Sequence, residues 1–194
     1  TLGMKVDLTF GSGWPAGAPF ITEHPERQLL MASAMLKNAD VLHDLPAAAE
    51  PLYAKVGNRL VEGIQGSFDS NTLLKAVTAA RKNDKGELVE FVDLSAQVDG
   101  QRVRWTVPTG DWLLFAFYQN ATRHNVLASA FPGAEIQNAS HQVNVIDHLD
   151  EAGIQEYIDK LGKPWLEKLA PYKPQAFFED SFELIGELPW SNRF

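Results

Sequence analysis

Three carboxylates lie close together near the end of the chain: Glu179, Asp180 and Glu183. They follow an apolar run at 176–178 that begins shortly after Pro174, a pattern typical of a buried strand with acidic residues at its end. Two neighbouring carboxylates do not ionise independently, so one pKa rises toward the range that suits a general acid. Glycoside hydrolysis requires such a pair. Exposed acids at the start of a loop are the alternative, since Asp180 and Glu183 converge only if the chain turns between them.

A second polar group, Asp147-His148-Leu149-Asp150, precedes a segment with helical periodicity. His148 has the chemistry to bind a hydroxyl group, transfer a proton or ligate a metal ion. A helix cap or a structural contact is the competing interpretation. The five histidines show no HExxH spacing, which disfavours a zinc site. The motifs GxSxG, GxGxxG and the P-loop do not occur in the sequence either.

Trp14 lies in a loop rich in glycine and proline, 11–19, that follows an alternating segment at 4–10. Glycines allow the backbone to approach a ligand closely, and the indole provides a flat apolar face for stacking. A tryptophan that closes the edge of a core would fit the same residues.

The elements that must position these residues are mostly strands. Alternation and turn residues predict an antiparallel β unit with strands at 73–80, 88–94, 102–107 and 111–119. The region 27–36 is compatible with a helix or a strand, and 41–46 is extended. A helix is predicted from Glu151 to about Leu169, with Asp150 as its N-cap and with Pro164 either kinking it or splitting it in two. A strand at 176–178 follows.

The 194 residues carry a net charge of -8 and no cysteine. The acidic balance disfavours nucleic acid and an anionic membrane as partners, because both need clustered Lys and Arg. No apolar stretch is long enough for a transmembrane helix, and the first residues do not resemble a signal peptide. Because the chain starts at Thr1 and stops abruptly at Phe194, we expect it to be a piece of a longer protein.

Several segments together resemble one family. Their order matches that in glycoside hydrolase family 106, the α-L-rhamnosidases. The segments are residues 3–8 running into Gly11-Ser12-Gly13-Trp14-Pro15, then Val107-Pro108-Thr109-Gly110-Asp111-Trp112, Asp147-His148-Leu149 and 178–183. The resemblance covers nearly the whole chain and is weak at 34–70. It implies the N-terminal part of an α/β catalytic domain, a partial (β/α)8 barrel formed by 1–70 and 120–194 with an inserted antiparallel β unit at 71–119.

The same resemblance implies roles for single residues. Glu183 would be the general acid and Asp180 a supporting carboxylate, while Trp14, Asp147 and His148 would line a pocket for terminal α-L-rhamnose. The family inverts the anomeric centre and uses a calcium ion, most of whose ligands are expected outside this chain. The general base is expected beyond Phe194, so the remainder of the parent polypeptide would be a partner and the chain alone would be inactive. Export to the periplasm or the extracellular space is also implied.

Two other classes of function remain open at this point. Trp105 and Trp112 would stack on sugar if the chain were a non-catalytic carbohydrate-binding β module, although tryptophans on strands are more often part of a core. A structural or interaction domain would have no sugar pocket around Asp180 and Glu183.

Overall fold

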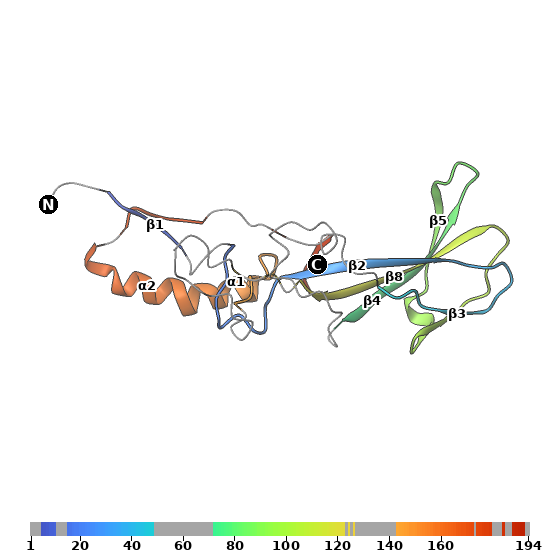
Figure 1. Ribbon diagram of the computed structural model, residues 1–194, viewed down its shortest axis with the longest axis horizontal. Helices are drawn as coiled ribbons and strands as arrows, with labels where there is room; N and C mark the ends of the chain where they lie inside the picture. The colour runs from blue at the N-terminus through green and yellow to red at the C-terminus, as the bar shows by residue number, and fades with distance from the viewer. Residues whose placement is uncertain are drawn as a thin grey trace, which may run out of the picture. The chain divides into compact units, whose positions relative to one another are not determined.

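The computed structural model describes residues 5–10, 15–48, 72–122, 124, 126, 143–172, 174–179, 184 and 188–192. The chain divides into two compact units (Figure 1). Unit 1 comprises Thr1–Gln28, Val56–Gly66 and Ala121–Phe194, and unit 2 comprises Leu29–Lys55 and Ser67–Asn120.

Antiparallel β structure makes up most of unit 2. Four strands lie side by side in the order β2 (Arg27–Met35), β8 (Asp111–Ala121), β4 (Leu73–Lys82) and β5 (Leu88–Asp93) (Figure 1). A second sheet has the order β3 (Leu42–Asp44), β7 (Arg102–Arg104) and β6 (Val98–Asp99), and a short 3-10 helix spans Ser95–Gln97. β4 pairs antiparallel with both β5 and β8.

The core of unit 2 follows from the alternation of its strands. Ala79 and Leu114 are cross-strand partners on β4 and β8, and both are fully buried. The same cluster contains Trp112, which is 1% exposed and meets Trp105 edge to face with the ring centroids 5.0 Å apart. Cross-strand apolar pairs of this kind stabilise a sheet, so both tryptophans contribute to the core.

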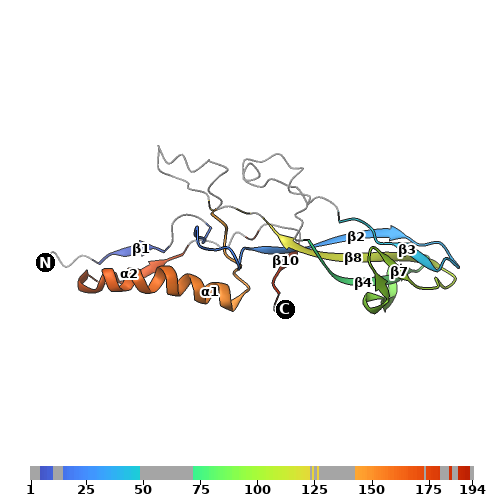
Figure 2. The same cartoon turned by 90° about the horizontal axis from the view of Figure 1, so that it is seen from below.

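Unit 1 contains the α-helices of the described residues. α1 (Glu151–Tyr157) continues through a π-helical turn (Ile158–Gly162) into α2 (Lys163–Lys168), and a 3-10 turn (Ala170–Tyr172) follows. Figure 2 shows α1 and α2 as one continuous rod beside β1 (Asp7–Thr9). β1 pairs in parallel with β9 (Ala176–Phe178), and β10 (Leu188–Trp190) is the last strand.

An aromatic cluster holds the helix against the parallel pair. Phe10, directly after β1, meets Tyr157, Trp165 and Phe177 with ring centroids 5.3, 6.2 and 5.3 Å away. Edge-to-face aromatic contacts of this kind add about 0.5–1.5 kcal/mol each beyond the area they bury. The cluster lies beside a buried core of Ala16, Ala18, Ile21, Ile146 and Tyr157.

The prediction of an α/β fold with a partial (β/α)8 barrel is wrong. A barrel of that type needs parallel strands that are each followed by a helix. Within the described residues, β4 pairs antiparallel with β5 and β8, β7 pairs antiparallel with β3 and β6, β1 and β9 form a parallel pair, and one α-helical segment spans α1 and α2. The segment 27–36, left open between helix and strand, forms β2 beside β8. None of the described helices has the length and apolar character needed to cross a membrane.

The separate strand predictions agree better with the structure. The apolar run at 176–178 is β9, and the predicted strands between residues 73 and 119 correspond to β4, β5, β7 and β8. Asp150 caps α1 as predicted, since its side chain accepts a hydrogen bond from the backbone of Ala152. Pro164 lies at the start of α2, directly after the π-helical turn, so the regular α-helical hydrogen bonding is interrupted next to the proline.

Candidate functional site

One extended segment, 143–147, forms the framework of the candidate site in unit 1. Its backbone is hydrogen-bonded to three other parts of the unit, near residues 16, 24–26 and 124–126. These bonds are Ile146 N–H to Ala16 O at 3.0 Å, Glu26 N–H to Val145 O at 2.9 Å, Asp147 N–H to His24 O at 2.9 Å, Val145 N–H to His124 O at 3.0 Å and Val126 N–H to Val143 O at 2.9 Å. Residues far apart in the sequence are therefore held in register around it.

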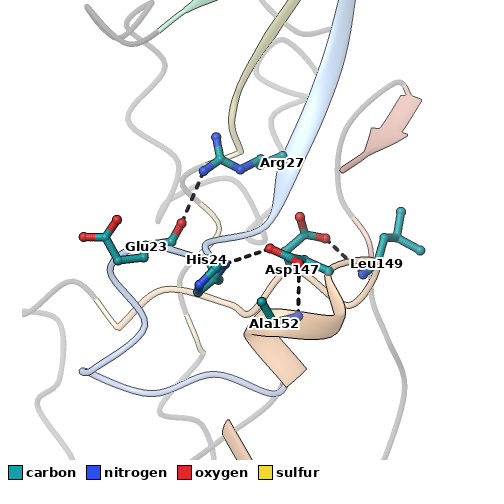
Figure 3. Close-up of polar contacts among 7 residues, drawn as sticks. Glu23, His24, Arg27, Asp147, Leu149 and Ala152 are labelled. Carbon is teal, nitrogen blue, oxygen red and sulfur yellow. Dashed lines mark hydrogen bonds and ion pairs between the residues drawn. The ribbon is translucent and has the colours of Figure 1, made fainter. Parts of the chain in front are cut away.

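His24 is fixed at the start of α1. Its Nδ1–H donates to Asp150 Oδ2 at 2.7 Å, while Asp150 Oδ1 accepts the N–H of Ala152 at 3.1 Å. Figure 3 shows His24 beside the helix start, close to Asp147. A Cβ added at Gly153 would lie 2.9 Å from the Cβ of His24, so the glycine allows the helix to approach this closely. One carboxylate thus caps the helix and orients the imidazole.

Asp147 is 2% exposed. Its Oδ1 accepts the N–H of Leu149 at 3.0 Å (Figure 3). Burial raises the pKa of Asp147, and the nearby negative charge of Asp150 adds to the increase, whereas the contacts with Leu149 and Ser191 and the charge of Arg27 oppose it. A buried carboxyl group with a raised pKa is typical of positions where proton transfer or polar recognition takes place.

The raised pKa of Asp147 predicts how stability depends on pH. Because the folded protein binds this proton more tightly than the unfolded chain, the carboxyl group favours folding at low pH. That contribution is lost as the pH rises through the folded-state pKa. We therefore expect the free energy of unfolding of Asp147→Asn to rise relative to that of wild type as the pH increases from 3 to 7. Urea denaturation of wild type and Asp147→Asn at several pH values measures this difference in unfolding free energy.

Asp84→Asn is the matched control, since Asp84 lies in the exposed turn between β4 and β5. Because its side chain is exposed, we expect the difference in unfolding free energy between Asp84→Asn and wild type not to show the rise expected for Asp147→Asn between pH 3 and pH 7. If the two variants gave the same pH profile, burial of Asp147 would not be the source of the effect.

A second buried polar group, formed by Glu26, Thr122 and His124, is hydrogen-bonded to the framework segment through the backbone of Val145. Glu26 and His124 are 3% and 5% exposed, and His124 Nδ1–H donates to Glu26 Oε2 at 3.2 Å. The hydroxyl group of Thr122 donates to the same oxygen at 2.7 Å, and its Oγ1 accepts the N–H of His124 at 3.2 Å. An acidic and a basic side chain thus share a buried, hydrogen-bonded site.

His148 is half-buried, and the charges of Glu26 and His124 act on its ring. Burial lowers its pKa, and the positive charge that His124 carries when protonated acts in the same direction, while the carboxylate of Glu26 raises it. At neutral pH a lowered pKa favours the uncharged imidazole, which offers one donor and one acceptor nitrogen. This is the form suited to binding a hydroxyl group.

The end of the parallel pair forms a third part of unit 1. Glu179 is the residue after β9, and Phe10 N–H donates to Phe178 O at 2.8 Å. Tyr157 is buried among these aromatic residues, and burial together with the charge of Glu179 raises its pKa to about 12. Tyr157 therefore stays protonated at neutral pH.

Of the predicted site residues, Asp147 is the last residue of the framework segment 143–147, and His148 follows it directly. Trp14, Asp180 and Glu183 fall outside the described residues. The sequence prediction missed Glu26, Thr122 and His124, and it recognised Asp150 only as a helix cap. For Glu26 the sequence holds one signal: His24 and Glu26 are two residues apart on an extended segment, where side chains at i and i+2 point to the same face.

A calcium site finds no support in the described part of the chain. No group of three or more His, Cys, Asp or Glu side chains there is arranged to hold a metal ion. The carboxylates of Glu26 and Asp150 instead accept hydrogen bonds from His124 and His24. Calcium takes six to eight oxygen ligands, backbone carbonyls included, and most of them were expected outside this chain, so the calcium site stays a prediction.

Comparisons with protein-family models, with curated proteins and with solved structures find no match for this chain.

Proposed function

We propose that this chain is the part of an α-L-rhamnosidase that supplies the general acid, Glu183, with Asp180 as a supporting carboxylate. The observation that carries the proposal is the parallel register of β1 and β9, in which Thr9 is the partner of Phe178. Phe10 follows β1 and leads in the sequence to Gly11, and Glu179 follows β9 at the start of the acidic segment. The chain therefore continues toward two motifs of the family resemblance from the same end of one strand pair.

The described end of the strand pair fits this assignment. Thr9 and Phe178, the last residues of β1 and β9, are cross-strand partners, and Phe10 N–H donates to Phe178 O at 2.8 Å. Phe10 also contacts the rings of Tyr157 and Phe177, so the point from which the acidic segment continues is apolar.

The framework around residues 143–147 supports a role in sugar binding for Asp147 and His148. A buried carboxyl group and a largely uncharged imidazole provide donors and acceptors without a net positive field. Such a site suits a neutral, hydroxyl-rich ligand such as a rhamnose-containing oligosaccharide or glycoside. From the family resemblance we also propose that the protein acts in the periplasm or outside the cell.

Product stereochemistry tests the function. We expect the parent protein to release rhamnose from an aryl α-L-rhamnoside, and ¹H NMR of the first product should show the β-anomer before mutarotation. Inversion requires a water between two carboxyl groups, whereas retention proceeds through a covalent intermediate. The α-anomer as the first product would exclude the inverting mechanism. Absence of any hydrolysis by the parent protein would overturn the rhamnosidase proposal.

A further inference from the structure

Glu26 has no part in the function proposed above, yet its surroundings are unusual. The side chain is 3% exposed, and its Oε2 accepts hydrogen bonds from Thr122 Oγ1 at 2.7 Å and from His124 Nδ1 at 3.2 Å. Burying a carboxylate costs several kcal/mol unless its partners compensate for the lost hydration. An apolar side chain would fill the same space at a lower cost, so the buried polar group points to a function in recognition or catalysis.

Two imidazoles from different segments interact with this one carboxylate. His124 contacts it directly, and the charge of Glu26 acts on His148 against the effect of burial. The backbone holds His124 in register with Glu26, because Val145 N–H donates to His124 O and Glu26 N–H donates to Val145 O, and His148 follows Val145 by three residues. Glu26 is therefore the shared electrostatic partner of both rings.

The hydrogen bond at Nδ1 determines what His124 can do. When a carboxylate accepts the Nδ1–H, the neutral ring carries no proton on Nε2, so that nitrogen is an acceptor. Carboxylates orient metal-bound and catalytic histidines in the same way. An orienting carboxylate also reduces the freedom of the ring, which lowers the entropy lost on binding a ligand.

We propose that Glu26 is a positioning residue that orients His124 and His148 to hydrogen-bond the hydroxyl groups of a neutral saccharide. The identity of that saccharide as a rhamnoside rests on the function proposed above. The buried carboxylate disfavours an anionic ligand through charge repulsion, and no group of described residues is arranged to hold a metal cation. A neutral ligand with vicinal donors and acceptors matches two imidazoles best.

NMR of the histidine rings in the wild-type chain tests the positioning role without any ligand. The ¹⁵N shifts of His124 should show the Nδ1–H tautomer, which is the minor form of a free neutral imidazole. In Glu26→Gln, the pKa of His148 should fall, because the negative charge that favours its protonated form is gone. Glu90→Gln is the control: it removes an equal charge, from an exposed pair with Arg81 in unit 2, and should leave both rings unchanged.

Two results would overturn the positioning role. One is an Nε2–H tautomer at His124 in wild type, a measurement that does not depend on whether any variant folds. The other is a His148 titration that is identical in wild type and in folded Glu26→Gln.

Titration with methyl α-L-rhamnopyranoside, followed through the same ring signals, tests the ligand. We expect Glu26→Gln to weaken binding about tenfold or more, which corresponds to about 1.4 kcal/mol, and Glu90→Gln to leave it unchanged. Equal affinity of wild type and Glu26→Gln would overturn the positioning proposal and leave the rhamnosidase proposal intact. If the chain bound another neutral monosaccharide in a Glu26-dependent manner and did not bind the rhamnoside, the positioning role of Glu26 would be supported and rhamnose would be rejected as the ligand. If wild type bound no monosaccharide, the saccharide site itself would be rejected.

Discussion

Glu183→Gln in the parent enzyme is expected to lower kcat on methyl α-L-rhamnoside by about 10²–10⁴-fold, the usual contribution of a general acid. A methoxide leaving group needs a proton in the transition state, and the amide of glutamine cannot supply one. With 2,4-dinitrophenyl α-L-rhamnoside the loss should be less than about tenfold, because this leaving group departs without protonation. Steady-state kinetics on the two substrates measures the difference.

Glu179→Gln is the matched control for this prediction. It removes the neighbouring carboxylate that directly follows β9, which the family motif does not assign to proton transfer. We expect similar, modest effects of Glu179→Gln on both substrates. Should Glu183→Gln reduce both rates by the same factor, Glu183 would not be the proton donor, whatever the size of the loss.

Gly17→Ala is expected to destabilise unit 1 by about 3 kcal/mol or more, the range of severe packing defects. A Cβ at this position would lie 2.3 Å from Asn144 O and 2.4 Å from Val126 Cγ2. The first contact is with backbone, so a side-chain rotation cannot relieve it. Gly17 is also the bridge partner of Val145, and the clash therefore acts directly on the segment that carries Asp147.

Urea denaturation gives the loss of stability, and amide hydrogen exchange locates it. The N–H of Asp147, which donates to His24 O, should lose protection in Gly17→Ala. Gly162→Ala is the control within unit 1. Outside its own helix, the added Cβ would meet only the end of the Phe10 ring, at 3.1 Å. Alanine also has a higher helix propensity than glycine. If the two variants had the same stability, the packing at Gly17 would be looser than the structure indicates.

Local elements could be predicted from the sequence where periodicity and turn residues agree. The strands β4, β5 and β8 alternate and are separated by polar turns, and the cap at Asp150 precedes an amphipathic segment. β2 was ambiguous for a physical reason. Its buried positions are Gln28, Leu30 and Ala32, and the polar glutamine interrupts the apolar alternation that identifies a strand.

The architecture could not be predicted in the same way, because strand pairing depends on contacts between distant segments. The resemblance suggested parallel strands in a barrel, whereas the described strands β4, β5 and β8 and the sheet of β3, β7 and β6 pair antiparallel. The site shows the same limit. Asp147 and His148 were recognisable from their position before a helix, whereas Glu26 and His124 are 98 residues apart and only the fold makes them neighbours.

The antiparallel pairing of β2 with β8 has a consequence for the order of folding. At one end of this pair Leu36 N–H bonds Trp112 O, and at the other end Thr122 N–H bonds Glu26 O. The antiparallel register places Glu26 opposite Thr122, although 96 residues separate them in the sequence. Once this pairing has formed, the loop-closure entropy between the two segments is already lost, so the contact of Glu26 with His124 adds almost no further closure cost.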